Sequence, residues 1–219
     1  MNFLKDSWYL FQKDLKLELR QQYAINGLLL YVGGTVFLVY TTFREIDSTT
    51  WLGIFWIILL FSAANTVAKS FTQDSTSRQL YYYTLVGPEK VVFTKIFFNF
   101  FLLLLISILA LAVYSLLLGY PILDTGLFLL VLVLGCANFA AVFSMSGAIA
   151  FKAGGNSTLV PILSFPILIP VIMLLISASK AAMTEITSVN LYKDLGMLAA
   201  LFVLTLTLSL ILYPFLWKD

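Results

Sequence analysis

The chain has 219 residues, of which 61% are hydrophobic, and its formal net charge is +2. Only 11% of the residues are charged, whereas a soluble domain is about 45 to 50% apolar with roughly a quarter of its residues charged. The composition therefore excludes an ordinary soluble protein, and the small net charge gives no indication of nucleic-acid binding. We expect a single integral membrane domain over residues 1–219, surrounded mostly by lipid.

Residues 1–22 combine charged side chains with an apolar stripe. Leu4, Trp8, Phe11, Leu15 and Leu19 recur at helical spacing, and the basic residues occupy other faces. This pattern is typical of an amphipathic helix that lies in the membrane interface. We expect the helix to lead into the first span as an elbow. The alternative, a frayed polar tail, has no reason to keep the stripe.

Six apolar stretches follow, and a helix needs about 20 such residues to cross a hydrocarbon core of about 30 Å. The predicted spans lie near 23–43, 51–68, 93–119, 124–151, 158–179 and 195–217. An ionised group at the bilayer centre costs roughly 2.5 to 3.5 kcal/mol, so we expect all charged side chains to lie outside these spans. The predicted fold class is an all-α membrane protein with six transmembrane helices.

Lysine and arginine are distributed unevenly over the two sides of this predicted bundle. Three of them, Arg44, Lys180 and Lys193, fall on one side. The other side receives Lys5, Lys13, Lys16, Arg20, Lys69, Arg78, Lys90, Lys95, Lys152 and Lys218. By the positive-inside rule, both termini are expected in the cytoplasm.

The connection over residues 69–92 is the longest polar segment after the amino terminus. A short helix is predicted within it, capped by Asp74 and ended by Gly87, and Pro88 is expected to open the next helix. This cytoplasmic coupling loop is where a soluble partner could bind. The predicted contact residues are Asp74, Ser75, Arg78, Gln79, Leu80 and Tyr81.

Span four carries small residues at every fourth position, Ala140, Ser144 and Ala148. Small residues let helix backbones approach closely in lipid. We interpret this face as packing within the chain, with a homodimer or translocation surface as the functional alternative. Three uncharged amides, Asn65, Asn99 and Asn138, are expected to bond neighbouring helices rather than a ligand.

Span five follows Gly154 and Gly155 and contains Pro161, Pro166 and Pro170. Each proline lacks a backbone donor, which predicts a bent or broken helix. Irregular backbone at membrane depth persists only where protein or a water-filled cavity satisfies it. The segment is therefore either a gating element on a substrate path or a static kink.

The sequence contains no pattern for catalysis or metal binding. It has no histidine, the commonest metal ligand, and its only cysteine, Cys136, lies within span four. It has no Walker A loop and no intramembrane carboxylate of the kind that couples secondary transport. We expect no enzyme activity, no metal site and no cofactor held by this chain. A partner would supply the energy for any transport.

Three segments carry a family resemblance: KDLKLELR near the amino terminus, the connection from Phe71 to Lys95, and LGCANFAAVFSMSGAIAFKAGGNSTLVPILSFPILIP. An elbow helix, six spans and a short cytoplasmic helix together resemble the membrane subunit of a type-2 ABC exporter. Within that class the three segments resemble the CcmB family, the haem exporter protein B of cytochrome c maturation. The resemblance extends over nearly the whole chain.

This resemblance implies a permease subunit of the bacterial inner membrane that pairs with a cytoplasmic CcmA-like ATPase, which binds the ATP. CcmC-like and CcmD-like membrane subunits would complete the complex, with haem as its possible cargo. We expect a homodimer docked on two ATPase subunits through residues 74–85. Either haem crosses this subunit, or ATP hydrolysis releases a haem-loaded chaperone from the CcmC-like subunit, and the absence of histidine favours the second.

Two other functions compete with this one. The chain could be a type-2 ABC permease for a lipid, a polysaccharide or a drug, which differs in cargo and not in mechanism. It could also be a membrane scaffold that holds partners without transport.

Overall fold

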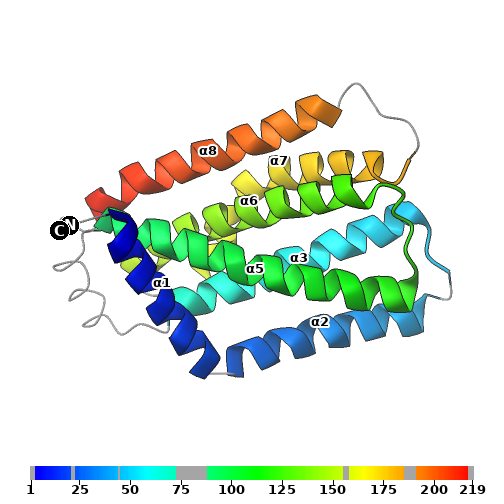
Figure 1. The fold of residues 1–219 in the computed structure, drawn as a ribbon, viewed down its shortest axis with the longest axis horizontal. Coiled ribbons are helices and arrows are strands. Elements are labelled where there is room, and N and C mark those ends of the chain that lie inside the picture. The colour runs from blue at the N-terminus through cyan, green and yellow to red at the C-terminus, as the bar shows by residue number, and fades with distance from the viewer. Residues whose placement is uncertain are drawn as a thin grey trace.

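The computed structural model describes residues 3–20, 23–43, 45–72, 88–154, 158–184 and 191–216. All the regular structure in this part of the chain is α-helical (Figure 1). The helices are α1 (Phe3–Arg20), α2 (Tyr23–Thr42), α3 (Ser48–Thr72), α5 (Pro88–Leu118), α6 (Thr125–Lys152), α7 (Leu159–Ala181) and α8 (Leu191–Leu216).

The long helices lie side by side, and α1 crosses one end of the bundle (Figure 1). This end, called the α1 end below, also holds the last turns of α3, α6 and α8 and the first turn of α5 (Figure 1). At the opposite end the chain reverses between α2 and α3, between α5 and α6, and between α7 and α8. Helix α6 is central, because it packs against α3, α5, α7 and α8.

Among the described residues, five helices are long and apolar enough to cross a membrane. These segments are Ser48–Val67, Lys90–Leu118, Thr125–Lys152, Leu159–Ala181 and Leu191–Tyr213. In α2 the corresponding apolar segment, Leu29–Thr42, is shorter. The predicted helical membrane class is therefore confirmed with five candidate spans, and the sixth stays a prediction.

The helix ends differ from the predicted spans where polar residues extend a helix beyond its apolar stretch. Helix α3 begins at Ser48 and continues to Thr72, and α8 begins at Leu191, ahead of the predicted start at residue 195. The prediction that Pro88 opens a helix is confirmed, since α5 begins there. Proline is favoured in a first helical turn because its missing N–H would have no partner within the helix.

The prediction that every charged side chain lies outside the spans is wrong near the helix ends. Lys95 lies inside α5 and is only 6% exposed, and its Nζ donates a hydrogen bond to the carbonyl oxygen of Ser70 in the last turn of α3, at 2.7 Å. The last carbonyls of a helix lack partners within it and carry partial negative charge. A lysine from the neighbouring helix can therefore enter the bundle by satisfying one of them.

Helix α1 packs on α5 through aromatic side chains. Phe11 is buried, and its ring centroid lies 5.6 Å from that of Phe97, 5.9 Å from that of Phe98 and 6.0 Å from that of Phe101. Trp8, also on the predicted stripe, is 56% exposed. On this apolar stripe, Phe11 therefore packs against the bundle, whereas Trp8 is exposed on its surface. The side chains of Leu4 and Leu19 lie outside the described residues.

Asp47 caps the amino terminus of α3. Its Oδ2 accepts hydrogen bonds from the backbone N–H groups of Thr49 and Thr50, each at 3.1 Å, and its Oδ1 accepts one from the Thr50 hydroxyl. The Thr50 hydroxyl contributes most to lowering the pKa of the Asp47 carboxyl below its ordinary value of 3.8, and backbone hydrogen bonds add to it.

This lowered pKa gives a pH-dependent prediction. The cap stabilises α3 fully above the unfolded-state pKa of 3.8, and its contribution is lost as the pH falls through the lower folded-state value. At neutral pH we expect a higher thermal transition temperature for the wild-type protein than for Asp47→Asn, and the difference should shrink as the pH falls below 3.8. Thermal unfolding followed by circular dichroism at several pH values measures this. A constant difference between the two proteins at every pH would contradict the prediction.

Candidate functional site

The small residues predicted on span four lie in the interior of the bundle on α6. Ala140, Ser144 and Ala148 are at most 2% exposed in the single chain. A contact with a second copy would therefore have to use other residues. On the same helix, Gly135 lies where α6 closely approaches α3 and α7. A Cβ added there would lie 2.7 Å from the Trp56 ring of α3 and 3.1 Å from Leu175 Cδ2 of α7.

Buried polar side chains connect the helices. The amide Nδ2 of Asn99 on α5 donates to Ser144 Oγ on α6 at 2.9 Å. The amide Nδ2 of Asn138 on α6 donates to the backbone oxygen of Leu198 on α8 at 3.1 Å. The prediction that the amides bond neighbouring helices is confirmed for Asn99 and Asn138, whereas Asn65 is exposed. Ser144 serves as an acceptor as well as a small packing residue.

Removing the Ser144 hydroxyl should destabilise the bundle through Asn99. The Asn99 amide is fully buried, and its Oδ1 has no hydrogen-bond partner among the described residues, so Ser144→Ala would leave Nδ2 without this acceptor too. An unsatisfied buried donor costs about 1 to 3 kcal/mol. We expect a loss of this size in the free energy of unfolding in detergent, measured by denaturant titration.

The matched control for this prediction is Ser115→Ala, since the Ser115 hydroxyl bonds only the carbonyl of Ala112 in its own helix. The double variant Ser144→Ala with Asn99→Leu should recover part of the loss, because it removes the orphaned amide. Equal effects of the two serine replacements would contradict the assigned role of Ser144.

The proline segment forms a continuous helix. Helix α7 runs from Leu159 to Ala181 with Pro166 and Pro170 in its interior, so of the predicted bend or break the break is excluded and the bend stays a prediction. Pro161 lies in the first turn, where a backbone donor has no partner within the helix in any case. Gly154 has a φ of +104°, a left-handed conformation that favours glycine, and Gly155 lies outside the described residues.

The face of α7 that carries the prolines is exposed in the part of the chain that the structure describes. Ile162, Phe165 and Ile169 are 65%, 61% and 47% exposed, and both Pro166 and Pro170 are exposed. The gating role of Gly154, Gly155, Pro161, Pro166 and Pro170 stays a prediction.

The predicted coupling residues Asp74, Ser75, Arg78, Gln79, Leu80 and Tyr81 lie outside the described residues. The helices that flank this segment, α3 and α5, are joined by the hydrogen bond from Lys95 to Ser70. Sequence reasoning missed this lysine as a structural residue. The sequence feature that could have identified Lys95 is its position after Phe93, inside the span 93–119 that was predicted to be apolar.

No group of three or more Cys, Asp or Glu side chains lies together in the described part of the chain in a way that could hold a metal ion. Cys136 is buried, and its Sγ donates to Ser107 Oγ at 3.3 Å. The thiol is therefore part of the packing between α6 and α5.

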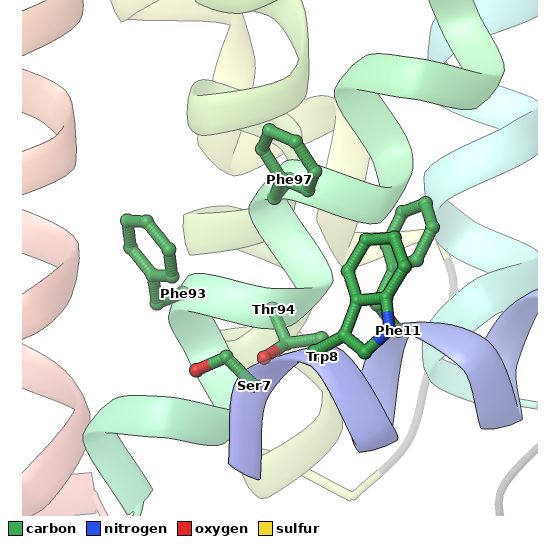
Figure 2. Close-up of a pocket in the computed structure, with 6 residues that line it drawn as sticks. All are labelled: Ser7, Trp8, Phe11, Phe93, Thr94 and Phe97. Atoms are coloured by element: carbon green, nitrogen blue, oxygen red, sulfur yellow. The ribbon is translucent and has the colours of Figure 1, made fainter. Parts of the chain in front are cut away.

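Next to α1 the bundle has an apolar hollow, called the α1–α5 groove below. It has a volume of about 310 Å³. Figure 2 shows its lining residues, which come from α1 and from the first turns of α5: Ser7, Trp8, Phe11, Phe93, Thr94 and Phe97. A second hollow of about 340 Å³ shares Phe93 and Phe97 and continues toward α6 and α8.

The described helices define a multi-pass helical membrane protein whose buried polar groups join helices to one another. The chain belongs to the CcmB family, because the family model described as CcmB protein matches residues 5–215. This is a family of membrane permease subunits in haem export and cytochrome c biogenesis, and its members are not catalytic enzymes. No match to the chain is found among the curated proteins.

Proposed function

We propose that this chain is the transmembrane permease subunit of an ABC transporter complex that acts in haem export or delivery for cytochrome c maturation. The observation that carries the proposal is the family match over residues 5–215, which covers nearly all of the chain. The helical bundle supports it, since the described helices leave no large soluble domain in which nucleotide could be hydrolysed. A separate CcmA-like ATPase would supply the energy.

The ATPase would dock at the α1 end of the bundle, which faces the cytoplasm in this proposal. Basic residues of the described helices gather there, at Lys13, Lys16, Lys90, Lys95 and Lys152. The opposite end carries only Lys180 and Lys193 in the described residues. The positive-inside rule favours a cytoplasmic α1 end, with both termini inside a bacterial plasma membrane. Residues 74–85 would form the contact with the ATPase.

The working unit would be a homodimer of type-2 ABC exporter architecture with CcmC-like and CcmD-like partners. The share of each membrane-crossing segment buried within the chain is 28% for α7 and 17% for α8, against 61% for α6. This contrast supports the proposal, because α7 and α8 keep most of their surface for lipid, a second copy or another subunit.

Deleting the gene tests the maturation role. We expect loss of all c-type cytochromes on a gel stained for covalently bound haem, because haem delivery precedes its attachment. Restoring the gene on a plasmid should restore the bands. Normal c-type cytochromes in the deletion strain would reject this role and favour a permease for a lipid, polysaccharide or drug.

A further inference from the structure

The α1–α5 groove lies at the depth of the lipid headgroups and ester bonds. Helix α1 is amphipathic, with Trp8 and Tyr9 56% and 70% exposed, as is typical of side chains at a membrane interface. The membrane-crossing segment of α5 begins at Lys90, so Phe93 and Phe97 occupy its first two turns. The surroundings of the groove are therefore lipid and not bulk water.

Two hydroxyl side chains line the groove beside the Trp8 indole, and one of these two hydroxyls is already satisfied. The Thr94 hydroxyl donates to the carbonyl oxygen of Lys90 at 2.7 Å. The Ser7 side chain is 9% exposed, and its Oγ has no hydrogen-bond partner among the described residues. In Figure 2 the Ser7 hydroxyl is directed away from α1, toward the side of the groove on which Phe93 lies. A buried hydroxyl without a partner is costly, so a bound acceptor at this point would be stabilised.

The small size of the groove favours a slender occupant. A transmembrane helix of a partner protein is about 10 Å across, so a hollow of about 310 Å³ could not enclose it. One alkyl chain is thin enough, and the second hollow beyond Phe93 and Phe97 gives it room to continue. Phe11, which lines the groove, is held in place by its contacts with the α5 aromatic rings, and these contacts need no ligand.

We propose that the α1–α5 groove binds one acyl chain of a membrane glycerophospholipid, and that the Ser7 hydroxyl donates a hydrogen bond to the ester carbonyl of that chain. The lining matches both parts of this ligand, with aromatic side chains for the alkyl chain and one unpartnered donor for the ester. The residues that line the groove are not among the proposed ATPase contact residues, and the proposal does not depend on the haem-delivery function.

Native mass spectrometry of the delipidated, purified protein tests the proposal with two probes. One is diacyl phosphatidylethanolamine, and the other is its diether analogue, which lacks the ester carbonyls. Loss of one hydrogen bond corresponds to a change of about 2- to 10-fold in affinity. We expect the wild-type protein to retain one diacyl lipid and to prefer it over the diether lipid by this factor. Ser7→Ala should retain both lipids equally.

Ser7→Phe places a ring in the groove and should remove lipid retention, with circular dichroism and gel filtration verifying the fold. Ser115→Ala is the matched serine control, and Ile162→Phe adds a ring on the exposed face of α7. Neither control should change retention. Equal retention of the two lipids by the wild-type protein would overturn the proposal, as would a folded Ser7→Phe variant that keeps its lipid.

Discussion

Replacing Gly135 with alanine should destabilise the bundle by about 1 to 3 kcal/mol, the range expected for overpacking a well-packed core. The added Cβ would lie 2.7 Å and 2.8 Å from two carbons of the Trp56 ring. This ring has little freedom to move, because Trp56 is 1% exposed and its Nε1 donates to Ser179 Oγ at 3.1 Å. The replacement would therefore strain the junction of α3, α6 and α7 at the centre of the fold.

The thermal transition of the purified protein in detergent measures this effect. Matched controls are Gly53→Ala and Gly196→Ala, since a Cβ at either position meets nothing within 4 Å. Alanine favours a helix more than glycine does, so the controls should be neutral or slightly stabilised. A Gly135→Ala protein as stable as these controls would mean that the three helices do not approach as closely as described.

Lys95→Met should also have a large effect, because it removes a charged hydrogen bond from the protein interior. Such a bond contributes about 1.5 to 3 kcal/mol, and methionine keeps an unbranched apolar side chain in place of the lysine stem without the charged amino group. The loss should appear as a lower free energy of unfolding and as faster hydrogen exchange in the last turn of α3, which contains Ser70. Lys95→Arg keeps a charged donor and should retain most of the stability.

The control for this charge removal is Lys193→Met, since Lys193 is exposed at the opposite end of the bundle. If the proposed coupling through residues 74–85 is right, Lys95→Met should also reduce haem delivery by a complex that still contains its ATPase, because Lys95 holds together the helices on either side of this segment. A destabilised protein with normal haem delivery would restrict Lys95 to a structural role. Unchanged stability and exchange would contradict the contact itself.

The sequence alone predicted most of the helices, because lipid imposes simple rules on length and polarity. The apolar stretches identified five spans, and the amides Asn99 and Asn138 could be assigned to helix contacts because an unpaired amide in hydrocarbon is costly. The family could also be recognised, since its motifs extend along the chain.

Contacts between helices could not be predicted from patterns along one helix. Lys95 was expected outside the bundle, because the carbonyl of Ser70 that satisfies it comes from another helix. The prolines of α7 predicted a bent or broken helix, but the helix continues through them, because an exposed helix face leaves room for the proline rings. Ser7 gave no signal in the sequence, because its significance depends on the groove that α1 forms with α5.

The central proposal, that this subunit depends on a separate ATPase, is tested most directly by affinity purification from membranes in mild detergent. We expect the wild-type protein to recover an ATPase with a Walker A motif together with CcmC-like and CcmD-like subunits. The Leu80→Asp, Tyr81→Asp variant should recover the membrane subunits without the ATPase. Wild-type protein that recovers no ATPase, and that alone drives uphill transport in liposomes, would contradict the account.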